Sequence, residues 1–183
     1  PAAGDAGGSL GAALAFWYQE LGNKREISHN KDEMKGSYLG PSFNNEEVKN
    51  TLNSLGAIYE EQKEDNLILL IANELKNEKT IGWFQGRMEF GPRALGARSI
   101  IADPRPNKMQ KELNLKVKFR ESFRPFAPSV LREDLNDWFE LNCDSPYMLL
   151  VSDVKKSKQI PMKEHEKKIF GIDKLNIKRS SIP

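Results

Sequence analysis

The chain has 183 residues, of which 38% are hydrophobic and 30% charged, and its formal net charge at pH 7 is +2. These totals are typical of an ordinary soluble globular protein and identify no partner. Because Cys143 is the only cysteine, they exclude an internal disulfide and a thiolate cage for a metal, which fits a reducing compartment.

The cellular location is predicted from the apolar stretches of the sequence. The longest of them, LILLIA at 67–72, is far too short to span a bilayer. The first residues, PAAGDAGGSLGAALAFWYQ, lack the basic start of a secretory leader. We therefore expect a cytoplasmic protein that has no membrane partner.

The first predicted helix follows a glycine-rich turn. In GDAGGSLGAALAFWYQELG, Leu10, Leu14 and Trp17 share one helical face, and Gly22 supplies a C-terminal stop. Residues 22–40 are polar and aperiodic, which predicts a linker or a surface loop.

A second helix is predicted to begin near Asn45, because Val48, Leu52 and Leu55 form an apolar stripe that ends before Gly56. The later elements are predicted from apolar runs and their periodicity. They are a short strand at 57–61, a buried helix at 66–79, a core strand at 80–86, a strand at 99–103, a helix at 107–118, a strand at 126–131, a helix at 132–141 and a strand at 146–154.

The irregular alternation of these helices and strands favours an α+β or mixed α/β domain from about residue 40 onward. Residues 155–181 are rich in lysine and weakly patterned, so we expect a mobile excursion there. The sequence contains no internal repeat and no low-complexity segment.

Positive charge is concentrated between Gly86 and Val130. Ten lysine and arginine residues lie there against four acidic ones, which makes this region +6 and the remainder −4. The asymmetry predicts a site for an anionic ligand. A solvated basic helix would account for the lysines of 107–118. It does not account well for four arginines that lie among glycines and prolines, because these residues interrupt helices: Arg87, Arg93, Arg98 and Arg105.

Two motifs of this region, GRMEFGPRALGARSIIADPR at 86–105 and VKFRESFRPFAPSVL at 117–131, resemble the signature of a known domain. It is the C-terminal domain of the NodU-type carbamoyltransferases, the nodulation-factor and antibiotic O-carbamoylating enzymes. YLGPSF at 38–43 is similar to the usual entrance of that domain, and PAAGDAGGSLGAAL is similar to the last segment of the actin-like (ASKHA) domain that precedes it.

The resemblance implies a domain organisation. Residues 1–37 would be the last segment and linker of the actin-like domain. Residues 38–183 would be a YrdC-like domain, with a twisted mixed sheet and flanking helices, truncated at its C-terminal end.

The resemblance also implies a two-stage reaction. The YrdC-like domain would form carbamoyl adenylate from carbamoyl phosphate and ATP, with magnesium as a candidate ion. The actin-like domain, using bound iron, would then transfer the carbamoyl group to a hydroxyl-bearing acceptor. The first stage brings two anions together while charge grows on phosphate oxygens, so it needs preorganised arginine and lysine side chains.

Lys118 and Arg124 match the family's lysine and arginine positions before PFAPS, and they are the predicted catalytic residues. Lys118 would neutralise phosphate charge, and Arg124 would orient the phosphate. A structural alternative stays open, in which Lys118 is a solvated helix end and Arg124 pairs with Glu121.

The predicted ATP-contacting residues are Arg87, Arg93, Arg98, Arg120 and Ser129. The glycines of FGPRALGARS would let backbone amides approach an anion closely. Alternatives stay open here too: Arg93 and Arg98 would clamp the actin-like domain, Ser129 would be a buried capping residue, and Glu89 would be an arginine partner rather than a base.

Asp5 is the candidate metal ligand, because the resemblance places an aspartate of GDAGGSLG in the iron site. The companion histidines would belong to upstream sequence. His29 and His165 lie far apart and outside any recognisable ligand spacing, so this chain would not complete a metal centre by itself. Alternatively, the small residues of this segment form a tightly packed helix.

The resemblance predicts that the isolated chain is inactive. Family members continue past SSIP with a segment that ends in another arginine, expected near the adenylation cleft. Residues 155–178 also look longer than the usual connection.

Two other classes of function stay open. The basic region contains aromatic residues and could bind RNA or another nucleic acid. Nucleic acid is disfavoured because its phenylalanines alternate with prolines, as core residues do. A non-catalytic interaction domain would instead fold stably without binding a nucleotide.

Overall fold

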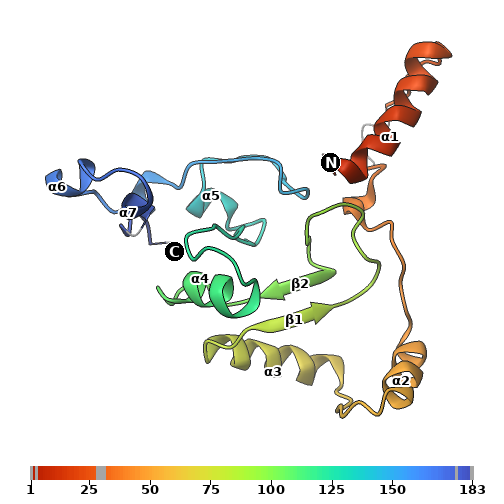
Figure 1. Cartoon of the computed structure of the whole chain (residues 1–183), viewed down its shortest axis with the longest axis horizontal. Helices are drawn as coiled ribbons and strands as arrows, with labels where there is room; N and C mark the ends of the chain where they lie inside the picture. Colours follow the sequence, from red (N-terminus) through yellow and green to blue (C-terminus); the bar gives the residue numbers. More distant parts are fainter. Residues whose placement is uncertain (1, 3, 28–31, 176, 182–183) are drawn as a thin grey trace. The chain divides into compact units, whose positions relative to one another are not determined.

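The computed structural model describes residues 2, 4–27, 32–175 and 177–181, and Figure 1 shows the course of the chain. Helical elements outnumber strands among these residues, and short 3₁₀ or π turns extend several helices. In chain order the elements are α1 (Asp5–Ala15), η1 (Phe16–Glu20), η2 (Lys35–Ser37), α2 (Asn45–Ser54), α3 (Glu64–Lys76), β1 (Ile81–Phe84), β2 (Arg98–Ile101), α4 (Met109–Glu112), η3 (Leu113–Val117), α5 (Leu135–Trp138), η4 (Lys156–Lys158), α6 (Glu164–Lys167) and α7 (Ile172–Leu175).

The chain divides into two compact units, and each unit is assembled from separate stretches. The first unit comprises residues 1–67, 82–100 and 145–149. The second unit comprises residues 68–81, 101–144 and 150–183. The predicted boundary between residues 37 and 38 stays a prediction.

The predicted helix at the start of the chain is confirmed as α1, which continues through the π turn η1. Gly22 follows with a φ angle of 63°, a left-handed conformation that ends helices. Leu10, Leu14 and Trp17 are all exposed, so the tight packing that was the alternative for this segment is not formed among the described residues.

The second predicted helix is confirmed as α2, and its start has a clear local cause. The Asn44 side chain accepts a hydrogen bond from the Glu47 backbone N–H at 2.9 Å, and the Glu47 carboxylate accepts one from the Asn44 backbone N–H at 2.7 Å. This capping box satisfies two amides that the first helical turn leaves without partners. Gly56, with φ of 63°, follows the helix end as predicted.

The helix predicted at 66–79 is confirmed as α3, but the prediction that it is buried is wrong. Ile68, Leu69 and Leu70 are exposed, and none of the residues of α3 is buried. Its composition favours a helix, and the rest of the described chain covers its apolar side chains only in part, since Leu67, Ile71 and Leu75 are half-buried. None of the described helices is both long enough and apolar enough to cross a membrane.

β1 and β2 pair as a two-stranded antiparallel sheet, which confirms the strands predicted near 80–86 and 99–103 (Figure 1). β1 is half-buried at best, so its predicted core position is wrong. The mixture of helices with a small sheet agrees with the α+β class. The described residues contain no larger mixed sheet, and the YrdC-like architecture stays a prediction.

Three predicted strands are wrong within the described chain, at 57–61, 126–131 and 146–154. Proline explains the second, because Pro128 has no N–H to donate to a ladder. The third contributes one isolated bridge, between Phe139 and Val154. Apolar composition alone therefore does not predict a strand where no neighbouring strand is present to form backbone hydrogen bonds.

Three of the buried side chains of the second unit lie on one helical segment. The helix predicted at 107–118 is confirmed as α4 and the π turn η3, where Met109, Leu113 and Asn114 are buried. The helix predicted at 132–141 is shorter than expected, because only α5 is helical, and Leu135 is its buried residue.

The segment 155–181 has more local structure than the predicted excursion. It contains η4, α6 and α7, and a bridge joins Gln159 to Ser180. The Lys178 Nζ donates to the Asn107 Oδ1 at 3.2 Å, which connects this segment to the start of α4 within the second unit.

Candidate functional site

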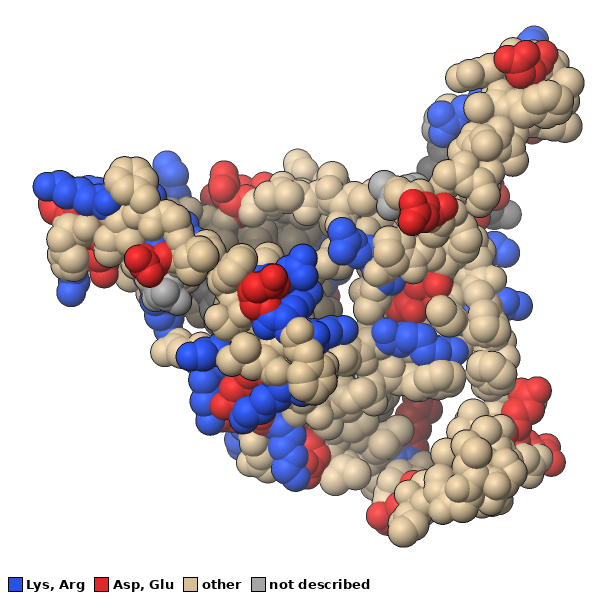
Figure 2. All heavy atoms as spheres, viewed as in Figure 1, with Lys and Arg blue, Asp and Glu red and all other residues tan. Residues whose placement is uncertain are grey.

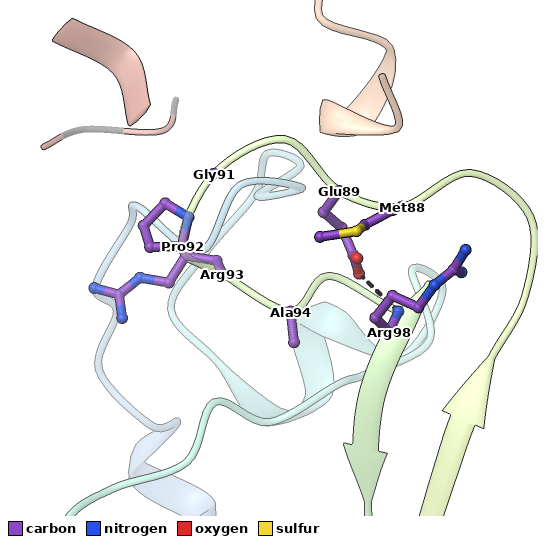
Figure 3. Close-up of a pocket in the computed structure, with 7 residues that line it drawn as sticks. All are labelled: Met88, Glu89, Gly91, Pro92, Arg93, Ala94 and Arg98. Atoms are coloured by element: carbon purple, nitrogen blue, oxygen red, sulfur yellow. Dashed lines mark hydrogen bonds between the residues drawn. The ribbon is translucent and has the colours of Figure 1, made fainter. Parts of the chain in front are cut away.

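A shallow hollow of about 220 Å³ lies in the loop that joins β1 to β2. Its lining residues, drawn in Figure 3, are Met88, Glu89, Gly91, Pro92, Arg93, Ala94 and Arg98. Gly91 and Gly96 have φ angles of 112° and 109°, which L side chains rarely adopt. The glycines thus permit the tight course of the loop that the sequence motif predicted.

The segment 37–41 runs beside this loop in the first unit. The Gly40 N–H donates to the Met88 carbonyl at 2.9 Å, and the Met88 N–H donates to the Pro41 carbonyl at 2.9 Å. The Tyr38 hydroxyl donates to the Leu95 carbonyl. The YLGPSF motif therefore supports one side of the hollow.

The buried side chain of Glu89 stabilises the loop between β1 and β2 through hydrogen bonds to its backbone. Its side chain is 5% exposed, and its Oε1 accepts hydrogen bonds from the backbone N–H groups of Leu95, Ala97 and Arg98 at 2.7, 2.8 and 3.2 Å. Burial alone would raise the pKa of Glu89, but these bonds outweigh it and lower the pKa below its ordinary value. Glu89 thus pairs with backbone amides instead of the arginine side chain that the sequence suggested.

The guanidinium group of Arg98 is occupied by the protein itself. It donates to the carbonyls of Gln85, Gly86 and Ala97 at 2.8 to 3.2 Å, and it stacks over the ring of Phe84 at 3.4 Å from the centroid. Arg87 is similarly used, because its Nη1 donates to the Gly40 carbonyl at 2.8 Å. Both predicted ATP contacts therefore already have structural partners.

Arg93 differs from these two arginines. Its side chain is exposed and points away from Arg98 in Figure 3. No hydrogen bond or ion pair joins its guanidinium group to another described residue. Among the three predicted arginines of this loop, Arg93 keeps its full capacity to bind an anion.

The second unit positions the other predicted residues on the loop that follows η3. Lys118 is exposed and makes no side-chain bond or ion pair to any other described residue. Phe119 comes next, with a φ angle of 50° and a side chain that is 86% exposed. A positive φ is strained for an aromatic residue, so the neighbouring structure must hold the loop in this conformation.

Arg120, Arg124 and Ser129 lie further along the same stretch. The Arg120 Nε donates to the Asn114 Oδ1 at 2.6 Å, and its guanidinium lies 4.8 Å from the centroid of the Phe126 ring, so this side chain is used structurally. Arg124 is exposed and only loosely paired with Glu121, at 3.8 Å. Ser129 is exposed, which argues against the buried capping role.

The predicted residues thus fall into two sets, because Arg87, Arg93 and Arg98 belong to the first unit and Lys118, Arg120, Arg124 and Ser129 to the second. Each set contains one cation without a described partner. Figure 2 shows basic side chains in blue interspersed with acidic ones in red around α4. There Lys116 lies 3.8 Å from Glu112 and Lys108 lies 2.7 Å from Glu78, which agrees with a solvated helical face.

Sequence reasoning gave no role to Asp103, although the structure buries it. Its carboxylate accepts hydrogen bonds from the backbone and side chain of Arg105, including both oxygens from Nε at 2.9 Å. The Arg105 side chain lowers the pKa of Asp103. The signal available in the sequence was the aspartate and the arginine on either side of Pro104. The fourth arginine of the motif, Arg105, is therefore the ion-pair partner of Asp103.

Asp5 lies in the first turn of α1 and is exposed. No group of three histidine, cysteine or acidic residues that could hold a metal occurs in the described ranges. His165 is exposed on α6, while His29 lies outside the described residues. Among the described residues, the Asp5 carboxylate is therefore the predicted iron ligand, and no cluster of further ligands lies around it.

Comparison with known proteins agrees with the motifs. Residues 72–174 match the family described as carbamoyltransferase C-terminus. The chain belongs to this family. The matched range includes the whole loop that forms the hollow and the whole loop that carries Lys118 and Arg124, and the predicted NodU-type resemblance is confirmed.

Three relatives illustrate the family. The chain is 54% identical to the uncharacterized protein sll1178 of Synechocystis sp., over 100% of this chain and 30% of that protein. It is 43% identical to nodulation protein NolO of Bradyrhizobium diazoefficiens, over 86% of this chain and 29% of that protein. It is 46% identical to nodulation protein U of Rhizobium tropici, over 45% of this chain and 14% of that protein. The chain thus spans less than a third of each relative.

Proposed function

We propose that this chain binds the carbamoyl donor in a carbamoyl-transfer reaction. Carbamoyl phosphate and ATP would react to form carbamoyl adenylate, and a hydroxyl-bearing molecule would finally accept the carbamoyl group. The observation that supports this most directly is the exposed ammonium group of Lys118, which has no partner among the described residues, followed six residues later by the loosely paired Arg124. Both lie within the range that matches the carbamoyltransferase family.

The physical argument concerns charge. Carbamoyl phosphate and the triphosphate of ATP repel each other, and negative charge increases on phosphate and pyrophosphate oxygens as the adenylate forms. A lysine without a competing acid supplies a compact positive charge, while an arginine can orient a phosphate through two parallel hydrogen bonds. We assign the first role to Lys118 and the second to Arg124, whose 3.8 Å contact with Glu121 would be exchanged for the ligand.

Arg93 is our third candidate for a phosphate contact, because it lines the hollow and has no described partner. Arg87, Arg98 and Arg120 are assigned a supporting role, since their guanidinium groups already bind carbonyls, an amide oxygen or aromatic rings. Ser129 is exposed and could donate to a phosphate. Magnesium would bind through the ATP phosphates rather than through a protein ligand set.

The second stage of the reaction is proposed for a different part of the protein. An actin-like domain, to which residues 1–37 would contribute, would bind the acceptor and an iron ion that assists the transfer. Among the described residues, Asp5 is our candidate ligand for that ion. Residues 38–183 would be the YrdC-like domain, and the protein would act in the cytoplasm.

Calorimetric titration of the full chain with ATP and with carbamoyl phosphate tests the proposal. We expect saturable binding that Lys118→Ala weakens about tenfold or more, because a charge-assisted hydrogen bond contributes about 1.5–3 kcal/mol. Lys116→Ala is the matched control: it removes the same charge from the preceding turn, where Lys116 lies near Glu112. Equal losses in both variants, or none in either, would contradict the role of Lys118.

Nucleic-acid binding is a second candidate, favoured by one observation. Phe119 was expected in the core, but it is exposed beside Lys118, where a base could stack on it. A titration with a short single-stranded RNA at several salt concentrations separates the two functions. RNA binding with a steep salt dependence that is lost in Phe119→Asn, together with no binding of carbamoyl phosphate, would favour the second candidate. Asparagine is chosen because it tolerates a positive φ.

A further inference from the structure

Asn114 is the most deeply buried polar side chain among the described residues, with 0% exposure. It lies on η3, one residue after Leu113. Its Nδ2 donates to the carbonyls of Ser122 at 3.1 Å and Arg124 at 2.8 Å, and its Oδ1 accepts from the Arg120 Nε at 2.6 Å. All of these side-chain bonds go to residues of one stretch, 120–124.

Gln110 reaches the same stretch from one helical turn earlier. Its Nε2 donates to the carbonyls of Phe123 at 3.3 Å and Arg124 at 3.1 Å. Residues four positions apart lie on the same face of a helix, so the two amide groups point toward the loop together. We name this pair, Gln110 and Asn114, the amide clamp.

The backbone completes the arrangement. The Lys118 N–H donates to the Leu113 carbonyl at 2.9 Å, and the Arg120 N–H donates to the Asn114 carbonyl at 2.9 Å. Three consecutive carbonyls, of residues 122, 123 and 124, therefore accept from the clamp. The side chains of Lys118 and Arg124 remain exposed. The loop is thus fixed through its backbone while its two cations stay available.

We propose that Asn114, assisted by Gln110, is a positioning residue that holds Lys118 and Arg124 ready for the phosphates of ATP and carbamoyl phosphate. The inference rests on the proposed function. The clamp orders the loop before the ligand arrives, so binding does not have to supply the free energy of ordering it. The clamp also directs three carbonyl dipoles toward itself, and carbonyl oxygens that turned toward a phosphate would repel it.

A purely structural role for Asn114 predicts something different. A buried side chain with three bonds stabilises the second unit, and its loss would lower the free energy of unfolding whatever the ligand. Leu113→Ala is the matched control, because Leu113 is also buried on η3 but its side chain makes none of these bonds. The control destabilises the same turn without releasing the carbonyls of Ser122 and Arg124.

The test uses the full chain and five proteins: the wild type, Asn114→Leu, Gln110→Leu, Leu113→Ala and Lys118→Ala. Circular dichroism and denaturant unfolding first establish that each is folded. Each is then titrated calorimetrically with ATP and with carbamoyl phosphate, and amide hydrogen exchange is followed over residues 118–126. Gln110→Leu keeps the test decisive if Asn114→Leu does not fold, because Gln110 is only half-buried.

We expect Asn114→Leu to weaken binding of both ligands about tenfold or more and Gln110→Leu to weaken it about threefold, each with faster exchange in the loop. Leu113→Ala should lose a similar free energy of unfolding and yet bind as the wild type does. If both clamp variants bind normally while Lys118→Ala does not, the inference is wrong and the proposed function stands. An equal loss of affinity in Leu113→Ala also overturns the inference. If the wild type binds neither ligand, or Lys118→Ala binds normally, the proposed function fails instead.

Discussion

Arg93, on the loop between β1 and β2, and Arg98, the first residue of β2, lie five residues apart, yet their guanidinium groups have different surroundings. Arg98 donates to three backbone carbonyls and stacks on Phe84, whereas Arg93 has no described partner and borders the hollow. A motif identifies both residues equally well. Only the structure separates a side chain that supports the loop from one that is free to bind.

The two arginines should therefore respond differently to substitution. We expect Arg98→Ala to lower the free energy of unfolding by about 1–3 kcal/mol, because three carbonyls lose a charged donor. Arg93→Ala should change it by less than about 0.5 kcal/mol but weaken ATP binding. Denaturant unfolding and calorimetric titration measure the two quantities. The converse pattern, with Arg93→Ala unstable and Arg98→Ala binding ATP more weakly, would reverse our assignment.

At the scale of elements, α2 provides a test that is independent of function. Asn44→Ala removes the side-chain acceptor of the capping box and should lower the free energy of unfolding by about 1 kcal/mol. Asn50→Ala, an exposed site in the interior of the same helix, is the control. It should be neutral or slightly stabilising, because alanine has the higher helix propensity. Urea unfolding followed by circular dichroism measures both effects.

The elements that could be predicted from sequence are those with local causes. The start of α2 is marked by the hydrogen bonds between Asn44 and Glu47. The ends of the first two helices are marked by the positive φ angles of Gly22 and Gly56. The strands at 57–61 and 146–154 were wrong because a strand depends on a partner far along the chain. The extent to which α3 is buried could not be predicted either, since the same apolar residues suit a core helix and a helix that is only partly covered.

The candidate site was predictable in part for a similar reason. Glycines and arginines identified the loops, and the family resemblance selected Lys118 and Arg124. The functions of Glu89 and Asn114 were missed, because most of their partners are backbone groups that no side-chain pattern reveals. One signal for Asn114 was available in the sequence. It is a polar residue that directly follows Leu113, one of the two buried apolar residues of this helical segment, and precedes the loop.

For the whole molecule, stability should decrease in acid. The pKa values of Asp32, Glu89 and Asp103 are all lowered in the folded protein: Asp32 chiefly by the Tyr147 hydroxyl, Asp103 chiefly by Arg105, and Glu89 by backbone amides that outweigh its burial. A lowered folded pKa means that the unfolded chain binds more protons. Their stabilising contribution is therefore complete above the unfolded values of about 4 and is lost as the pH falls through the lower folded values.

Glu89→Gln isolates the contribution of the most buried of these three carboxylates to the acid dependence. The amide oxygen can still accept backbone N–H bonds, but it carries no charge, so the free energy of unfolding at pH 7 should be lower and its decrease toward pH 3 shallower. Glu133→Gln, at an exposed position, should follow the wild type. Parallel curves for the wild type and Glu89→Gln from pH 3 to pH 7 would contradict the proposed role of this carboxylate.

The first unit is made of three separate stretches, of which the last, residues 145–149, lies far along the chain from the others, and this affects the order of folding. Tyr147 donates to Asp32 across 115 positions, and both residues belong to this unit. Closing so long a loop costs conformational entropy that only later contacts offset, so this contact should form late. On the ribosome, residues 1–100 emerge before residues 145–149 exist. The Asp32 carboxylate can therefore accept the hydrogen bond from Tyr147 only after the later part of the chain has been made.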